Sequence, residues 1–203
     1  MRPPLPRVHA VTDERVARRG DFNTVAMGLA RGGGPDLAFH ARGHTLSGRE
    51  HFELARTLGG HAPSTLFVSD RLDIALATGA VGVQLSWTRW SPVDARRVQG
   101  MWWIGCSVHD RNEAEAARTG GADYLLLGPM FPTPTHPGRE PLGLAAVRGI
   151  VRLGLPVIAI GGIEPRHVRA LAAEGVSGVA AIRGFWDAAD PAEAARSFVE
   201  AWR

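Results

Sequence analysis

The segment Pro156-Val-Ile-Ala-Ile-Gly-Gly-Ile-Glu-Pro165 decides how the rest of the chain is interpreted. Its run from Val157 to Ile160 is apolar at every position, which is typical of a strand buried on both faces of a parallel sheet. Two glycines follow the run, and a helix then begins at Glu164-Pro165, because proline is favoured at the first helical position. The segment therefore predicts one strand–turn–helix unit of an α/β protein.

The same kind of unit recurs eight times along the chain, at intervals of about 25 residues. Short apolar runs predict strands at 8–12, 37–40, 65–69, 81–85, 102–107, 124–127, 156–160 and 179–182. Amphipathic stretches predict helices at 22–31, 47–58, 71–78, 111–119, 142–153, 165–174 and 191–202, and one more that begins at Ser91-Pro92. Eight such units predict a closed (β/α)8 TIM barrel. An open doubly wound sheet is the alternative, but the first strand is followed by Thr12-Asp-Glu-Arg15 and not by the glycine-rich turn of a dinucleotide-binding sheet.

The composition is that of an ordinary globular protein, and it excludes several classes. With 203 residues, 45% of them hydrophobic, and no linker-like stretch, we expect a single domain over 1–203. The single cysteine, Cys106, excludes an intramolecular disulfide, and the absence of lysine excludes a Schiff-base or P-loop lysine. No apolar run reaches the ~18 residues of a membrane span, and the first residues lack a signal-peptide pattern, so we expect a cytoplasmic protein. The net charge of +3 comes from scattered arginines, which argues against a nucleic-acid partner and leaves a small molecule as the expected one.

The ends of the seventh and eighth predicted strands are the most informative positions, because a TIM barrel carries its active site at the carboxyl ends of its strands. Gly161 and Gly162 allow backbone N–H groups to approach an anion, which the following helix dipole also favours. Arg183 and Gly184 follow the last strand, and an arginine there can donate two hydrogen bonds to a phosphate. The two turns therefore predict a phosphate-binding corner, with a purely structural tight turn as the alternative explanation of the glycines.

Further candidate residues lie after the other strands. Histidine titrates near neutral pH, so a histidine at this face is a candidate for proton transfer. The candidate histidines are His40, His109 and His136; the candidate substrate-binding hydroxyls are Ser107, Thr133 and Thr135. His9 lies within the first predicted strand, where a buried core histidine is the expected role. No two histidines have the spacing of a metal site, so we expect no metal.

Seven motifs, in order along the chain, resemble the thiamine phosphate synthase/TenI family of small barrels. They cover nearly the whole chain, from Val8 to Trp202. The motifs are His9-Ala-Val-Thr-Asp13, Ser69-Asp-Arg-Leu-Asp-Ile-Ala-Leu76, Gly82-Val-Gln-Leu85, Ile104-Gly-Cys-Ser-Val-His109, Ala122-Asp-Tyr-Leu-Leu-Leu-Gly-Pro-Met-Phe-Pro-Thr-Pro-Thr135, Pro156-Val-Ile-Ala-Ile-Gly-Gly-Ile163 and Gly178-Val-Ala-Ala181. The resemblance implies one of two activities. A synthase joins hydroxymethylpyrimidine diphosphate to a thiazole phosphate with Mg2+, and the TenI branch isomerises a thiazole phosphate carboxylate to its aromatic tautomer.

The departures from the family pattern lie on the diphosphate side of the site that the resemblance implies. The Val-Gln-Leu-Arg-Glu-Lys pattern of the synthase, whose Gln, Arg and Lys hold the diphosphate, is replaced by Leu37-Ala-Phe-His-Ala-Arg42. Of the two aspartates that bind Mg2+ in the synthase, one is kept as Asp70 and the other is replaced by Arg89. Since Mg2+ needs oxygen ligands, an arginine there predicts a vestigial metal site, in which Arg89 and Asp70 pair.

The resemblance therefore favours a TenI-like protein that binds a thiazole phosphate and isomerises it without a metal or other cofactor. The histidine that moves the proton in TenI corresponds to Pro129 here. We expect a replacement among the three histidines, His136 first because it lies on the same loop, then His40, then His109. Two alternatives stay open: a divergent thiamine phosphate synthase, which would need Mg2+, and a silent paralogue that binds its ligand without turnover. Family members often form homo-oligomers, which is an expectation for this chain too.

Overall fold

The structure is a computed structural model that describes residues 2–61, 65–86, 89–133, 138 and 140–203. Eight parallel strands form one closed barrel in chain order, each hydrogen-bonded to the next, with β8 pairing back to β1. The strands are β1 (Val8–Val11), β2 (Leu37–Ala41), β3 (Thr65–Ser69), β4 (Gly82–Leu85), β5 (Trp103–Val108), β6 (Tyr124–Leu127), β7 (Val157–Ile160) and β8 (Gly178–Ala181). The predicted (β/α)8 barrel is confirmed.

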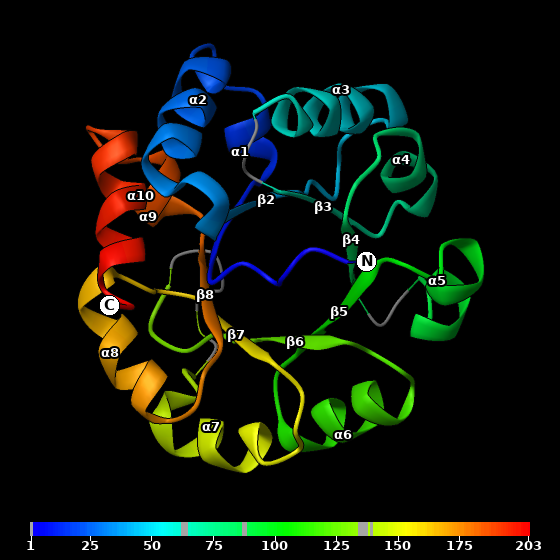
Figure 1. Cartoon of the computed structure of the whole chain (residues 1–203), viewed down its shortest axis with the longest axis vertical. Helices are drawn as coiled ribbons and strands as arrows, with labels where there is room; N and C mark the ends of the chain where they lie inside the picture. The colour runs from blue at the N-terminus through cyan, green and yellow to red at the C-terminus, as the bar shows by residue number, and fades with distance from the viewer. Residues whose placement is uncertain (1, 62–64, 87–88, 134–137, 139) are drawn as a thin grey trace.

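Helices surround the barrel on all sides (Figure 1). They are α1 (Glu14–Ala17), α2 (Phe22–Gly33), α3 (Gly48–Gly59), α4 (Leu72–Ala77), α5 (Pro92–Val98), α6 (Arg111–Thr119), α7 (Gly143–Val151), α8 (Pro165–Ala173), α9 (Arg183–Trp186) and α10 (Pro191–Glu200), with a 3-10 turn at Gly34–Asp36. The sequence did not predict α1, α9 or the 3-10 turn, because elements of three or four residues are too short to show an apolar period. No helix in these described ranges has the length and apolar character needed to cross a membrane.

Two layers of apolar side chains hold the barrel together. The larger one lies between the strands and the helices, and the smaller one fills the barrel interior around Phe67, Tyr124 and Ile158. Buried polar side chains lie beside this interior layer, those of His9 and His40, whose rings contact Phe67, and that of Gln84. Buried polar groups cost free energy unless they are hydrogen-bonded, so these three mark the part of the barrel where packing alone does not explain the sequence.

The amino-terminal segment covers one end of the barrel. Figure 1 shows it crossing from β1 toward β5, where the Trp103 indole N–H donates to the Pro3 carbonyl at 2.9 Å. Arg2 pairs with Asp123 at 2.8 Å on the same side. The opposite end, formed by the carboxyl ends of the strands, is the one left open for a ligand.

Candidate active site

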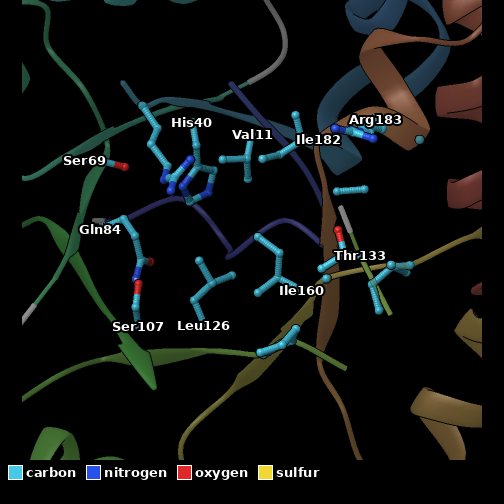
Figure 2. Close-up of a pocket in the computed structure, with 18 of the residues that line it drawn as sticks. Val11, His40, Ser69, Gln84, Ser107, Leu126, Thr133, Ile160, Ile182 and Arg183 are labelled. Atoms are coloured by element: carbon cyan, nitrogen blue, oxygen red, sulfur yellow. The ribbon is translucent and has the colours of Figure 1, made fainter. Parts of the chain in front are cut away.

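A cavity of about 590 Å3 lies at the carboxyl ends of the strands. Each strand contributes one lining residue; these are Val11, His40, Ser69, Gln84, Ser107, Leu126, Ile160 and Ala181. Figure 2 shows the polar side chains of β2 to β5 on one side of the cavity and Thr133 and Arg183 on the other, with Val11 and Leu126 between them. The cavity therefore has two polar sides joined by an apolar floor.

One side, which we call the glycine corner, consists of Thr133, Gly161, Gly162, Arg183 and Gly184. Gly161 and Gly162 have φ angles of +96° and +64°, which favour glycine. A Cβ on Gly161 would lie 2.8 Å from the Pro129 Cα, and one on Gly162 would lie 2.6 Å from the Pro132 carbonyl oxygen. The loop after β6 thus packs directly against both glycines, so they have a structural role as well as a place in the cavity wall.

Charged side chains frame the glycine corner. Arg183 begins α9, is exposed and lines the cavity, so its guanidinium is available to an anionic ligand. Glu164 also lines the cavity, but its carboxylate pairs with Arg166 at 3.0 Å. A dianionic phosphate fits this corner better than a neutral group does.

The opposite side, which we call the polar wall, consists of His40, Arg42, Ser69, Asp70 and Gln84. Three buried polar atoms of this wall have no hydrogen-bond partner among the described residues: His40 Nδ1, Ser69 Oγ and Gln84 Oε1. Gln84 uses its amide nitrogen to donate to Ser107 Oγ at 3.0 Å. Because buried polar atoms in folded proteins are nearly always paired, three unpaired ones beside the cavity mark this wall as a part of the site whose polar groups the protein itself does not satisfy.

His40 is held from behind by His9 on β1. His9 Nε2 lies 2.8 Å from the Pro6 carbonyl oxygen, and His9 Nδ1 lies 2.8 Å from His40 Nε2. Burial lowers the pKa of His9 to about 4, although the Pro6 carbonyl opposes the shift. Burial also lowers the pKa of His40 well below its ordinary value, and a charge on His9 or on Arg42 acts in the same direction. Both histidines are therefore neutral at neutral pH.

Arg42 and Asp70 complete the polar wall at its rim. The Arg42 backbone is fixed by Thr12, whose hydroxyl lies 2.8 Å from both the Arg42 N–H and the Arg42 carbonyl oxygen. Burial lowers the pKa of the Arg42 guanidinium, while nearby carboxylates, Asp70 among them, oppose that shift. Asp70 Oδ1 accepts a hydrogen bond from the Ser86 N–H at 2.7 Å. The wall thus presents a cation, and its one carboxylate lies close to that cation.

The polar wall offers a magnesium ion one carboxylate, where the resemblance implies two aspartates. Mg2+ is held by carboxylate and phosphate oxygens, and here Asp70 is the carboxylate on the polar wall, with the Arg42 guanidinium near it. Arg89 is exposed and lies outside the cavity, in a shallow groove beside α4 and α5. The predicted ion pair between Arg89 and Asp70 is wrong, since none joins them in the described ranges.

The structure brings nine of the predicted site residues into this one cavity: His40, Asp70, Ser107, His109, Thr133, Gly161, Gly162, Arg183 and Gly184. Thr135 and His136 lie outside the described residues. His109 is partly exposed, and its Nδ1 lies 2.9 Å from Glu113 Oε2 on α6. Its Nδ1 is therefore engaged by a carboxylate of α6, unlike the unpaired Nδ1 of His40.

Sequence reasoning did not find the contact between His9 and His40. The register pairs His9 with Ala38 and Val11 with His40, so the two histidines occupy diagonal inward positions on neighbouring strands. Alternation along a strand places residues two apart on the same face. That alternation, applied to both strands together, was the signal that would have identified the pair.

A cavity at the carboxyl ends of a closed barrel, with a glycine corner after β7 and β8, defines a (β/α)8 barrel with a candidate phosphate site. The family model described as thiamine monophosphate synthase matches residues 8–185. The chain belongs to that family, as its motifs predicted.

Individual relatives support the same assignment. A thiamine-phosphate synthase of Caldivirga maquilingensis is 40% identical over 150 residues, which cover 72% of each chain. A putative thiamine-phosphate synthase of Geobacter sulfurreducens is 34% identical and covers 95% of this chain and 92% of its own length. The solved structure of thiamine phosphate pyrophosphorylase from Pyrococcus furiosus superposes with a TM-score of 0.82 at 30% identity, over 96% of this chain and 94% of that one. These names agree more closely with the synthase alternative than with the TenI-like isomerase.

Proposed function

We propose that this protein binds a thiazole phosphate carboxylate and isomerises it to the aromatic tautomer without a metal ion. The observation that carries the proposal is the contrast within the cavity. The glycine corner offers backbone and Arg183 donors to a phosphate, while the polar wall offers a guanidinium and a neutral histidine in place of paired carboxylates.

The dimensions and polarity of the cavity suit such a substrate. Its phosphate is assigned to the glycine corner, and its ring to the apolar floor formed by Val11 and Leu126 (Figure 2). Its carboxylate is then directed toward Arg42, where a charge-assisted hydrogen bond would hold it. Isomerisation needs a base for the ring proton and no Lewis acid, which agrees with a wall that has one carboxylate and a guanidinium near it.

The synthase is the second candidate, and the names of the relatives favour it. One experiment separates the two. The purified protein is incubated with thiazole phosphate carboxylate in EDTA, and the aromatic product is followed by proton NMR. In parallel, it is incubated with hydroxymethylpyrimidine diphosphate, thiazole phosphate and Mg2+, and diphosphate release is measured.

Aromatic product in EDTA, with no diphosphate release in the parallel reaction, is the expected result. Diphosphate release that depends on Mg2+ would establish the synthase and overturn the proposal. Saturable binding of thiazole phosphate with neither product would assign the protein to the silent paralogues.

A further inference from the structure

The hydrogen bonds of the two buried histidines determine which ring nitrogens carry protons. A carbonyl oxygen only accepts hydrogen bonds, so His9 Nε2 must donate to Pro6, 2.8 Å away. Neutral His9 then has a lone pair on Nδ1, which must accept a hydrogen bond from His40 Nε2 at 2.8 Å. Neutral His40 is therefore left with its proton on Nε2 and a bare lone pair on Nδ1.

That lone pair belongs to a fixed ring at the cavity. His40 lines the cavity, is fully buried, and its Nδ1 has no hydrogen-bond partner among the described residues. The imidazole stacks on Phe67, with ring centroids 4.9 Å apart and planes 7° apart. A buried acceptor without a partner is costly, and one whose orientation is fixed by two neighbours is prepared for a partner that the ligand supplies.

We infer that His40 is the base that takes up the ring proton of the substrate through Nδ1, and that His9 and the Pro6 carbonyl position it. The inference rests on the proposed isomerisation. The bond between the ring carbon and its hydrogen breaks, and the proton goes to His40 Nδ1. The electron pair moves into the ring as the exocyclic double bond shifts into the ring, and the imidazolium returns the proton to the exocyclic carbon of that former double bond. The step has no net oxidation and leaves His40 neutral again.

The charges around His40 agree with this role. Arg42 on β2 carries a positive charge that disfavours an imidazolium, as His9 on β1 does when it is protonated, and Phe67 on β3 offers the ring an apolar face. Their effect, added to burial, keeps the pKa of His40 low and its Nδ1 unprotonated in the empty site. A substrate that carries a phosphate and a carboxylate supplies the negative charge that an imidazolium needs, so the base becomes stronger when the substrate is bound.

The first test replaces the base and keeps its hydrogen bond to His9. In His40→Gln the side-chain amide N–H can still donate to His9 Nδ1, but the side chain has no titratable atom. We expect kcat for isomerisation to fall about 10²-fold or more, the usual contribution of a positioned base, with KM changed less than about threefold. The matched control is His51→Asn, since His51 is also a buried histidine but bonds to the Ala41 carbonyl outside the cavity. His136→Ala is assayed beside them.

The second test addresses His9 as a positioning residue. In His9→Asn the amide oxygen can replace Nδ1 as the acceptor for His40 Nε2–H, whereas His9→Leu leaves that proton without an acceptor. We expect kcat to fall about 10- to 100-fold in His9→Leu and to be largely restored in His9→Asn, since orienting partners typically contribute that much. Nitrogen-15 NMR of the wild-type protein should show His40 protonated on Nε2 alone, and His9→Leu should show a mixture of tautomers.

The two proposals fail in different ways. Wild-type protein that makes no aromatic product fails the proposed function, and the inference about His40 falls with it. An active wild type with full kcat in His40→Gln, a rise in KM alone, or loss of activity only in His136→Ala would overturn the inference and leave the function in place. If His40→Gln does not fold, the NMR decides: a proton on His40 Nδ1 in the free protein, or no shift of that nitrogen at saturating thiazole phosphate, also overturns it.

Discussion

The two sides of the cavity are built by different means. The glycine corner depends on main-chain geometry: two positive φ angles, and a loop whose backbone packs against Gly161 and Gly162. The polar wall depends on side chains that reach across strands, such as His9 to His40 and the Asp70 carboxylate to the Ser86 N–H. The backbone therefore limits which residues can replace the two glycines of the corner, whereas single side-chain substitutions can change the polar wall.

The difference suggests how one barrel supports two reactions. A corner that binds the phosphate common to both substrates can stay as it is, while the facing wall determines the chemistry. In this chain the resemblance places Ala38, His40 and Arg42 where a synthase has its diphosphate-binding Gln, Arg and Lys. Function in such folds depends on the site and not on the barrel, so the wall should be tested separately from the corner.

The largest effect is expected at the corner, from Gly161→Ala. The new Cβ would meet the Pro129 backbone at 2.8 Å while alanine is forced to a φ of +96°. Strain and overpacking together should lower the free energy of unfolding by roughly 4 kcal/mol and abolish measurable binding of thiazole phosphate. Urea unfolding and calorimetric titration would measure both quantities.

Gly154→Ala is the matched control for that substitution. Gly154 has a φ of +85°, but its Cβ would meet nothing within 4 Å. In this variant, backbone strain alone should lower the free energy of unfolding, by ~1 kcal/mol, and thiazole phosphate should bind normally. Equal losses in the two variants would show that the packing of the loop after β6 does not hold the corner together.

The sequence predicted the corner and most of the barrel because their signals are local. The apolar run from Val157 to Ile160 and the glycines after it lie within ten residues, and the strands at 65–69 and 124–127 were predicted with their observed bounds. The polar wall could not be predicted as well, because its contacts depend on register and side-chain packing. His9 was expected in the core, where it lies. Its hydrogen bond to His40, however, joins residues 31 positions apart on two different strands. Arg89 was expected to pair with Asp70; both line the groove beside α4 and α5, but a loop position carries no signal of whether its side chain reaches a partner.

The next effect is the dependence of stability on pH, which comes from His9 behind the polar wall. His9 has a pKa of about 4 when folded against 6.5 when unfolded, so the unfolded chain binds more protons between those values. The contribution of neutral His9 to the free energy of unfolding is therefore fully present above about pH 6.5. It is lost as the pH falls toward 4, which lowers the free energy of unfolding by about 3 kcal/mol. The low pKa of His40 adds in the same direction.

Urea unfolding at a series of pH values between 7.5 and 4 would measure this dependence. His9→Asn is the comparison, because asparagine does not titrate and all other groups are shared. The variant should show a flatter loss of stability over the same range. Parallel curves would mean that His9 is not the buried neutral group that the hydrogen bond to Pro6 indicates.

A smaller effect is expected from Arg183→Gln at the corner. Arg183 is exposed, so the loss of its charge should weaken thiazole phosphate binding by about 1 kcal/mol, or about fivefold, without affecting stability. The difference from wild type should shrink at high salt, because exposed charges are screened. Arg166→Gln is the control, since Arg166 is an exposed arginine nearby that pairs with Glu164 and does not line the cavity. An equal loss in both variants would indicate general electrostatic attraction rather than a contact with the phosphate.

The smallest effect separates the two candidate functions, at Asp70→Asn. Asp70 has a φ of +56°, which asparagine tolerates, and the asparagine oxygen can accept the same hydrogen bond from Ser86 N–H. The substitution therefore removes one negative charge and little else.

If the polar wall works without a metal, the rate of isomerisation should change less than about threefold, with or without EDTA, because the charge only assists Arg42 at the rim. If the protein is a synthase, Asp70 is the one carboxylate of the family pair left to bind Mg2+, and its loss should abolish diphosphate release. A small structural change thus gives opposite outcomes for the two reactions, and steady-state rates of both, measured on the same preparation of Asp70→Asn, decide which chemistry the wall supports.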